Sequence, residues 1–421
     1  MTTATAGERA RDAVGGGEVP VRWVWLAAWP VTAVFVLSNA ATPLYVLWQR
    51  EMGFGRGTLT VVFACYIAGL LASLLVCGVV SDRIGRKPVL LPALGLALVA
   101  CLVFATAGGV GALIAARLCT GIAVGAVVSA GMAAVTDVAG PARRRLAALL
   151  ASCAMVFGAG LGPLLAGVLS ETLPGPTVTV FAVEAVLLAS AVVVVVRMPV
   201  RGAHEGHGGH GGGGRGAGRW VRVPGVPRGA GWQLALGIAV FAPGITATSF
   251  VLSLGPSLLA GLLGTGSRIV SGALAFAMFL SATGVQFAVR RLGRRTVLAC
   301  GAGTTALGMA ALLTAVHTGS VAALAGAALL AGAGQGMGQL GGLSLLNSAV
   351  PGARLAEANA ALNVGGYLPA GLLPVSAGYL SDAVGLTTGA TVFGTALTGL
   401  AVAGGGVVLL GRRRVSSRTA A

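Results

Sequence analysis

The sequence predicts an all-α integral membrane protein with twelve transmembrane helices, arranged as two pseudo-symmetric bundles of six helices. Three observations predict this class. Only 9% of the 421 residues are charged and 56% are hydrophobic, whereas a soluble domain carries about 25% charged residues. Twelve apolar runs are long enough to cross a membrane. Four short patterns also recur at a separation of about 210 residues.

The apolar runs are close to or longer than the roughly 20 residues that a helix needs to cross the hydrocarbon core. The first run is too long for the hydrophobic region of a signal peptide, so we expect it to remain as the first helix. Many runs contain Gly and Pro, which membrane helices tolerate. The predicted spans are 22–47, 58–80, 89–107, 110–136, 146–169, 176–197, 232–254, 269–289, 296–316, 320–347, 354–380 and 386–410.

The basic residues predict the orientation, because Arg and Lys concentrate in cytoplasmic connections. With a cytoplasmic N-terminus, every inner connection is basic: 83–87, 143–145, 198–231, 290–295, 354 and 412–414. Composition indicates a bacterial source, so both termini are expected on the cytoplasmic side of a bacterial cell membrane. The net charge of +17 then reflects topology and attraction to anionic lipid. It does not indicate nucleic-acid binding.

Residues 198–231 interrupt the hydrophobic pattern and divide the chain. The segment is rich in Gly, which predicts a flexible linker. Its His204, His207 and His210 leave metal sensing as a weaker alternative, and no metal site is predicted. The expected divisions are a cytoplasmic tail at 1–21, an N-terminal bundle at 22–197, the linker at 198–231, a C-terminal bundle at 232–410 and a basic tail at 411–421.

An internal repeat supports duplication of a six-helix unit. Such parallel repeats place the binding site of a transporter between the halves. The aligned patterns are Asp82–Lys87 with Arg290–Arg295, Asp137 and Pro141 with Asn347 and Pro351, Pro163–Gly167 with Pro374–Gly378, and Gly121 and Gly125 with Gly334 and Gly338. Their offsets are 208, 210, 211 and 213. The second half has Arg290 in place of Asp82 and Leu330 in place of Arg117.

The polar loop between the second and third runs resembles the G-x-x-x-D-R-x-G-R-K signature of the major facilitator superfamily. Matching residues are Gly78, Asp82, Arg83, Gly85, Arg86 and Lys87. Asp137 and Arg145 resemble the charged end of helix 4 in that family. The resemblance implies the superfamily fold and a gating latch. Asp82 would face the N-terminus of helix 11 and Arg86 would pair with Asp137, with both contacts present in the outward-open state and broken in the inward-open state. A role in topology alone is the alternative.

Two further motifs resemble the same family. Arg117, with Gly121 and Gly125, resembles the arginine motif of helix 4. The run Gly158-x3-Gly162-Pro163-x3-Gly167 resembles a helix 5 motif associated with the drug:proton antiporter branch. Small residues also permit close helix packing in membranes, and this structural explanation is equally open.

Glu184 is the one clearly intramembrane acid among the eleven in the chain. A charge at that depth costs about 2.5–3.5 kcal/mol on insertion scales, so the group is expected to be paired, protonated or functional. Arg117 is the corresponding intramembrane base at a similar depth. We predict that both take part in proton coupling, and a structural ion pair is the alternative.

The expected substrate path contains few charges, which favours a lipophilic or weakly polar compound. The polar candidates along it are Asn39, Tyr45, Tyr66, Gln335, Gln339 and Asn363. No nucleotide-binding or hydrolase motif is present, so the chain is not predicted to be an enzyme or to use a cofactor. The predicted function is proton-coupled efflux of a lipophilic drug-like compound or metabolite, as in multidrug resistance. Uptake or facilitated diffusion of a metabolite is the alternative, and a non-transporting sensor is a remote one. The expected partners are the substrate, protons and the lipid bilayer, and a monomer is expected.

Overall fold

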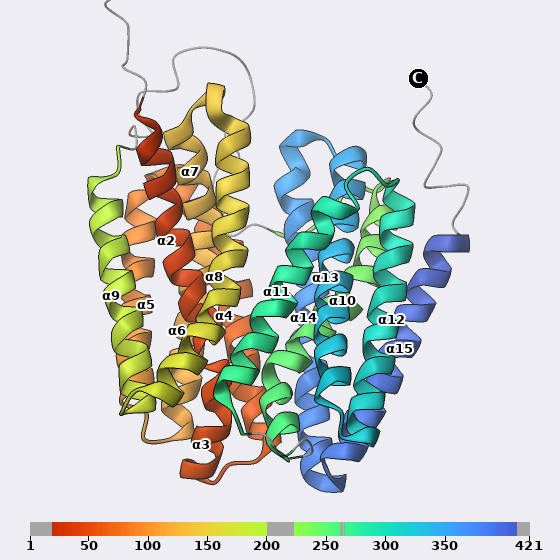
Figure 1. Ribbon diagram of the computed structural model, residues 1–421. Helices are drawn as coiled ribbons and strands as arrows, with labels where there is room; N and C mark the ends of the chain where they lie inside the picture. Colours follow the sequence, from red (N-terminus) through yellow and green to blue (C-terminus); the bar gives the residue numbers. More distant parts are fainter. Residues whose placement is uncertain (1–18, 200–222, 262–263, 265, 411–421) are drawn as a thin grey trace, which may run out of the picture.

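A computed structural model describes residues 19–199, 223–261, 264 and 266–410. Every regular element in these ranges is helical (Figure 1). His204, His207 and His210 lie outside the described residues, as do most of the linker and most of both tails. The first half contains α2 (Val21–Ala40), α3 (Tyr45–Met52), α4 (Arg56–Ile84), α5 (Lys87–Ala105), α6 (Val110–Ala126), α7 (Met132–Ala139), α8 (Arg144–Thr172) and α9 (Pro176–Arg197). The second half contains α10 (Gly231–Gly261), α11 (Arg268–Ala288), α12 (Arg294–Thr318), α13 (Val321–Ala349), α14 (Leu355–Val384) and α15 (Leu386–Leu410).

Two of the predicted spans are each built from two helices. α2 and α3 form the first span and are joined by a 3₁₀ turn at Thr42–Leu44. Pro43 lies in this turn, where it cannot donate a backbone hydrogen bond to a continuing helix. α6 and α7 form the fourth span through a π-helical turn at Val127–Gly131. Within the described residues, eleven spans are long and apolar enough to cross a membrane. The twelfth, α14, has 30 residues and carries more polar side chains.

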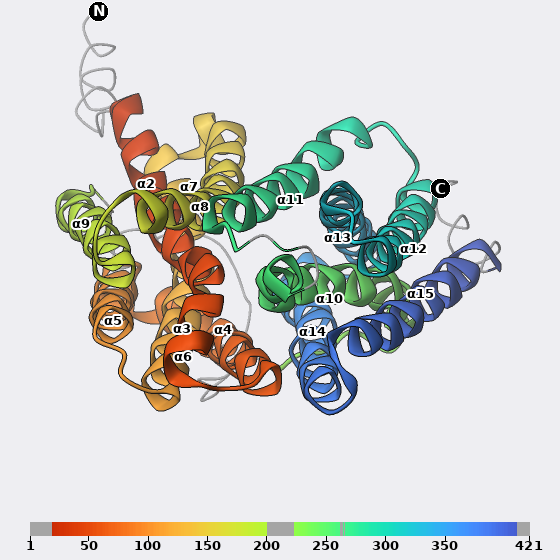
Figure 2. The ribbon, with the colours of Figure 1, turned by 60° about the horizontal axis from the view of Figure 1, so that its bottom comes forward.

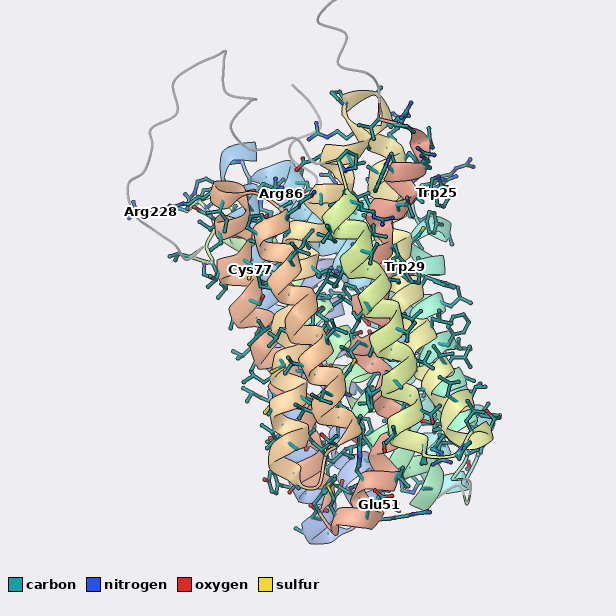
Figure 3. The ribbon with its side chains drawn as sticks, turned by 90° about the vertical axis from the view of Figure 1, so that its left-hand side faces the viewer. Trp25, Trp29, Glu51, Cys77, Arg86 and Arg228 are labelled. Atoms are coloured by element: carbon teal, nitrogen blue, oxygen red, sulfur yellow. The ribbon has the colours of Figure 1, made fainter. Side chains whose placement is uncertain are left out.

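The helices form two groups that correspond to the two halves of the chain. Figure 2 shows α2–α9 in one group and α10–α15 in the other. We call the end that carries Arg86 and Arg143 the basic end, and the opposite end, which carries Glu51, Glu171 and Asp382, the far end. Figure 3 shows Arg86 and Glu51 at these opposite ends.

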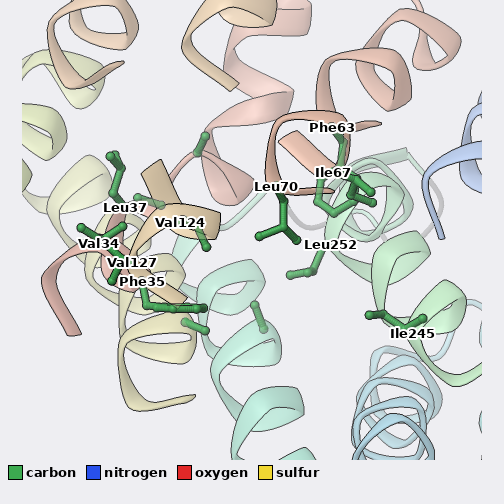
Figure 4. Close-up of a cluster of buried hydrophobic side chains, with 14 of the residues drawn as sticks. Val34, Phe35, Leu37, Phe63, Ile67, Leu70, Val124, Val127, Ile245 and Leu252 are labelled. Atoms are coloured by element: carbon green, nitrogen blue, oxygen red, sulfur yellow. The ribbon is translucent and has the colours of Figure 1, made fainter. Parts of the chain in front are cut away.

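Large hydrophobic side chains cover much of the outer surface, among them Leu102, Val186 and Leu307 with exposed fractions of 62–68%. Such a surface matches a lipid environment, and the chain is a multi-pass membrane protein. Inside, one buried hydrophobic cluster continues from the first bundle into the second. Figure 4 shows part of it, with Phe63, Ile67 and Leu70 of α4 and Leu252 of α10.

Glycines set the close approach of helices within each bundle. A Cβ atom at Gly121 or Gly125 would collide with the backbone of α4, at Tyr66 and Leu70 respectively. In the second bundle the glycines that approach the backbone of α11 in the same way are Gly332 and Gly336. The alignment of Gly121 and Gly125 with Gly334 and Gly338 is therefore wrong by two residues. The packing gives an offset of 211, the same as that between Pro163 and Pro374.

The two bundles contact each other closely at the far end. A Cβ atom at Gly57 of α4 would lie 2.5 Å from the Tyr379 ring of α14. Glycines also bring α8 against α11, because a Cβ atom at Gly272 would lie 2.9 Å from the carbonyl carbon of Pro163. In Figure 1 the ribbons of α8 and α11 are adjacent at the far end and separate toward the basic end. The structure is therefore closed at the far end.

Candidate transport site

The signature loop joins α4 to α5 at the basic end. Gly85 ends α4 with φ of 98°, a conformation that favours glycine because it has no Cβ atom. Arg86 follows and donates hydrogen bonds to Asp82 Oδ1 at 2.6 Å and to Asp137 Oδ2 at 2.9 Å. Burial alone lowers the pKa of Arg86, but the hydrogen bonds to the two carboxylates outweigh it and raise that pKa above its usual value. Arg86 is therefore a fixed cation that holds two acids together.

The other loop residues lie around this ion pair. Gly78 is buried in α4, and Arg83 is exposed on its last turn. Lys87 donates from Nζ to the carbonyl oxygen of Val196 at 2.9 Å and so ties α5 to the end of α9. Arg145 is exposed near the start of α8. Across the described residues, no ion pair of Arg145 is found.

The structure contains the Arg86–Asp137 pair that was predicted for the latch. Asp82, Arg86 and Asp137 all belong to the N-terminal bundle, and the Arg86–Asp137 contact is intact while the far end is closed. Which end of the molecule faces the cytoplasm is itself a prediction, so the dependence of this contact on the outward-open and inward-open states stays a prediction. Because the three residues move as part of one bundle, their pairing does not have to break when the bundles rearrange.

Arg117 lies in the interior of the N-terminal bundle with an exposed fraction of 0%. Its Nη1 donates to the carbonyl oxygen of Ser38 at 2.7 Å. Among the described residues, Nε and Nη2 have no hydrogen-bond partner. Aromatic rings surround the guanidinium, whose central carbon lies 5.1–5.9 Å from the ring centres of Tyr45, Phe104, Phe63 and Tyr66. Cation–π attraction of this kind compensates part of the cost of burying the charge.

Glu184 of α9 is also buried, with an exposed fraction of 1%. Its Oε2 atom has no hydrogen-bond partner in the described part of the chain. Phe181, one turn earlier, stacks on Phe104 with a centroid distance of 4.7 Å, and Trp48 stacks on both rings. Phe104 also contacts Arg117. The aromatic stack therefore links the surroundings of Glu184 and Arg117, and the two charged groups form no ion pair in the described structure.

The helix 5 motif packs α8 against two different partners. Cβ atoms at Gly158 and Gly162 would collide with the carbonyl oxygens of Thr32 and Val36 in α2. A Cβ atom at Gly167 would collide with the carbonyl oxygen of Arg268 in α11. Pro163 lies within α8, and its carbonyl group faces Gly272 of α11. The motif therefore permits close packing inside the bundle and also between the bundles.

The predicted substrate-path residues do not form one cluster. Tyr45 and Tyr66 meet at Arg117, and Asn39 is buried nearby, donating to Ser38 Oγ at 3.0 Å. In the second bundle, Gln335 and Gln339 are half-buried in α13, and the Oε1 atom of Gln335 lacks a partner among the described residues. Asn363 is half-buried in α14.

Two groups of residues at the centre of these contacts were not singled out from the sequence. The aromatic side chains of Trp48, Phe104 and Phe181 come from three helices, and no linear pattern joins them. Glu171 and Asp382 lie at the far ends of their helices, and each binds the opposite bundle. A signal for this pair did exist, because they are 211 residues apart, the offset of the internal repeat.

Comparison with known proteins places these features in a family context. The profile of the Major Facilitator Superfamily matches residues 24–290. The 3-(3-hydroxy-phenyl)propionate transporter of Escherichia coli K12 is 32% identical over 133 residues, which are 32% of this chain and 31% of that protein. The major facilitator-type transporter psiT2 of Psilocybe cubensis is 36% identical over 125 residues, 29% of this chain and 23% of that protein. The matches thus span about a third or less of these relatives.

Solved structures match over nearly the whole length. A bacterial homologue of the human lysosomal transporter Spinster, in an inward-facing and unoccupied conformation, gives a TM-score of 0.72 at 16% identity. The match covers 95% of this chain and 98% of that one. The nucleoside transporter NupG gives a TM-score of 0.68 at 12% identity and covers 92% and 99% of the two chains. At these identities the likeness concerns the fold.

Proposed function

We propose that this chain, which belongs to the major facilitator superfamily, is a small-molecule transporter rather than an enzyme and couples transport to protons. In this proposal the two bundles expose the substrate path alternately to the two sides of the membrane. A lipophilic drug-like compound or metabolite is the substrate, and efflux is the physiological direction. The basic end faces the cytoplasm, as the distribution of Arg and Lys favours, and the transporter acts as a monomer.

The buried Oε2 atom of Glu184, which has no hydrogen-bond partner among the described residues, is the observation that carries the proposal. A buried carboxylate without a counter-ion is strongly disfavoured in an apolar interior, whereas a protonated carboxyl group is tolerated there. Glu184 meets this condition, since it is 1% exposed and its Oε2 atom has no partner among the described residues. Binding and release of a proton at Glu184 would therefore change the energy of the surrounding packing.

The aromatic stack gives this change a route to the rest of the bundle. Phe181 lies one turn from Glu184 and stacks on Phe104, which contacts the guanidinium of Arg117. Arg117 in turn holds the carbonyl oxygen of Ser38 in α2. When Glu184 loses its proton, the nearest buried cation is favoured to approach it. That cation is Arg117, which can move toward Glu184 because its Nε and Nη2 atoms have no hydrogen bonds in the described structure.

Two observations bear on the direction of transport and on the substrate. The Gly158–Gly167 motif resembles that of proton-antiport exporters, and this resemblance supports efflux. Uptake of a metabolite is the second candidate, and it is favoured by the similarity to a transporter named for 3-(3-hydroxy-phenyl)propionate. The free edge of the Arg117 guanidinium, among aromatic rings, is chemically suited to an aromatic carboxylate of that kind.

Transport by purified protein in proteoliposomes tests the proposal. The membrane potential is held at zero, a pH gradient of one unit is imposed, and two probes are followed: the lipophilic dye ethidium and 3-(3-hydroxyphenyl)propionate. Proton antiport moves the dye toward the acidic compartment, with a limit of about tenfold accumulation for a one-to-one exchange. Movement of the aromatic acid with protons would instead favour the uptake alternative.

Glu184→Gln is the decisive variant, because it keeps the size of the side chain and cannot exchange a proton. We expect it to lose gradient-driven accumulation and to retain substrate exchange between the two compartments. Glu357→Gln is the matched control, since Glu357 lies at the basic end and pairs with Arg354 at 3.0 Å. Accumulation by Glu184→Gln equal to that of the control would refute a coupling role for Glu184.

A further inference from the structure

Asp382 connects the two bundles at the far end. It lies in the last turn of α14, and its Oδ1 and Oδ2 atoms accept hydrogen bonds from the backbone N–H groups of Arg56 and Gly57 at 2.9 and 2.8 Å. These N–H groups belong to the first turn of α4, in the other bundle. The first N–H groups of a helix have no partner within the helix, and the helix dipole favours a negative charge there. Asp382 therefore caps a helix of the opposite bundle.

Glu171 makes the reciprocal connection. It lies in the last turn of α8, in the N-terminal bundle, and its Oε1 atom accepts a hydrogen bond from the backbone N–H of Arg268 at the start of α11. Its Oε2 atom lies 3.3 Å from the hydroxyl oxygen of Ser267. The side chain of Arg268 completes the contact by donating to the carbonyl oxygen of Ser170 at 2.7 Å.

The internal repeat relates these two contacts residue for residue, although Ser267 donates from its hydroxyl where Arg56 donates from its backbone N–H. Glu171 and Asp382 are 211 residues apart, and so are Arg56 and Ser267, and Gly57 and Arg268. Each bundle thus supplies one carboxylate and receives one at a helix N-terminus. We propose that these two reciprocal carboxylate clamps hold the far end closed, and that their release is a required step when the far end opens.

Glycines one turn before each acid make the clamps possible. Gly167 and Gly378 are again 211 residues apart. A Cβ atom at Gly378 would lie 2.8 Å from the carbonyl oxygen of Arg56, and one at Gly167 would collide with that of Arg268. The backbones must therefore meet before each carboxylate can reach its N–H partners. Separation of the bundles by a few ångströms removes both clamps together.

The clamps are suited to a reversible gate. Asp382 is about one-third exposed, so water can replace its hydrogen bonds when the bundles part. Charge-assisted hydrogen bonds to a helix N-terminus are strong enough to bias an equilibrium and weak enough to break during a transport cycle. The proposal concerns the movement of the bundles and does not depend on proton coupling or on the identity of the substrate.

Distances between spin labels test the proposal without a transport assay. The six native cysteines are replaced, and labels are placed at Thr106→Cys and Thr318→Cys, exposed far-end positions on opposite bundles. A second pair, Ala142→Cys and Arg291→Cys, reports on the basic end. Removing one clamp with Asp382→Ala or Glu171→Ala should raise the ratio of far-end-open to far-end-closed molecules by about 3- to 30-fold. Asp382→Asn retains one acceptor and should have a smaller effect.

The double variant Asp382→Ala, Glu171→Ala gives a sharper test. The two clamps lie on separate helix pairs, so the factors by which each single variant raises the ratio of open to closed molecules should multiply. Glu357→Gln is the matched control: it removes the same charge at the basic end, where Glu357 pairs with Arg354 of its own bundle. Thermal unfolding identifies variants that fail to fold, and Asp382→Asn and Glu171→Gln replace any alanine variant that does. Longer far-end distances in the clamp variants, with the control unchanged, support the proposal. Unchanged far-end distances in the folded single and double variants overturn it.

Discussion

Gly272 of α11 offers a sharp test of how the far end closes. A Cβ atom at this position would lie 2.9 Å from the carbonyl carbon of Pro163 and 3.0 Å from the Cα atom of Leu164, both in α8. Non-bonded carbon atoms prefer separations of about 3.5–4.0 Å. Gly272→Ala therefore requires α8 and α11 to move apart by roughly 0.5–1 Å, since both obstructing atoms belong to backbone that cannot rotate away.

The magnitude follows from the cost of inserting a methyl group into a close contact, which is about 1–3 kcal/mol. The cost exists only while the far end is closed, so the ratio of far-end-open to far-end-closed molecules should rise roughly 5- to 150-fold. The spin-label pair at Thr106→Cys and Thr318→Cys measures this ratio. The basic-end pair should report a change in the opposite sense.

Gly284→Ala is the matched control on the same helix. Among the described residues, no neighbouring atom lies within 4 Å of a Cβ atom at that position. Alanine also favours a helix over glycine by up to about 1 kcal/mol, so this variant should be at least as stable as the parent protein. Far-end distances that respond equally to Gly272→Ala and Gly284→Ala would refute the packing argument.

Two further predictions concern the basic end. Asp82→Asn should reduce the transport rate in proteoliposomes far more than any single substitution within 290–295, since only the first loop carries the acid–arginine pair. If substitutions in the two loops reduce the rate equally, the first loop serves only to set the topology. Asp137→Asn removes the negative charge from the 2.9 Å contact with Arg86 and should lower the melting temperature by at most about 2–4 °C, because partly exposed ion pairs contribute about 1 kcal/mol or less. Because the pKa of Arg86 is raised, the stabilising contribution of its charge is complete below about pH 12. The difference in melting temperature between the parent protein and Asp137→Asn should therefore stay constant from pH 6 to 9. A change in the sign of that difference within this range would contradict the prediction.

The sequence predicted the membrane class and the spans well, because these depend on local composition. Low charge content and long apolar runs require helices that bury their backbone hydrogen bonds in lipid, and the structure has helices at all twelve predicted runs. It also placed Glu184 and Arg117 within membrane-spanning helices, and both prove to be buried. The sequence did not predict how Glu184 and Arg117 lie relative to each other, because the aromatic rings between them come from helices far apart in the chain.

The internal repeat was visible in the sequence, but its register was not fully determined. Glycine is so frequent here that Gly334 and Gly338 matched as well as the true equivalents, Gly332 and Gly336. Only the contacts with the backbone of α11 separated the two alignments. The reciprocal positions of Glu171 and Asp382 then followed from the corrected offset. Burial patterns alone would not have found them, because both acids lie at helix ends near the surface.

A reversible disulfide across the far end tests most directly whether transport requires the two bundles to separate there. A Cβ atom at Gly57 would lie 2.7 Å from Cγ of Tyr379, so the two Cβ atoms lie at most about 4.2 Å apart, within the range that a disulfide spans. The double variant Gly57→Cys, Tyr379→Cys, without the native cysteines, is oxidised in proteoliposomes and then reduced. We predict that cross-linking reduces net flux at least tenfold and that dithiothreitol restores it. Full flux through completely cross-linked protein would contradict alternating access by separation of the bundles at the far end.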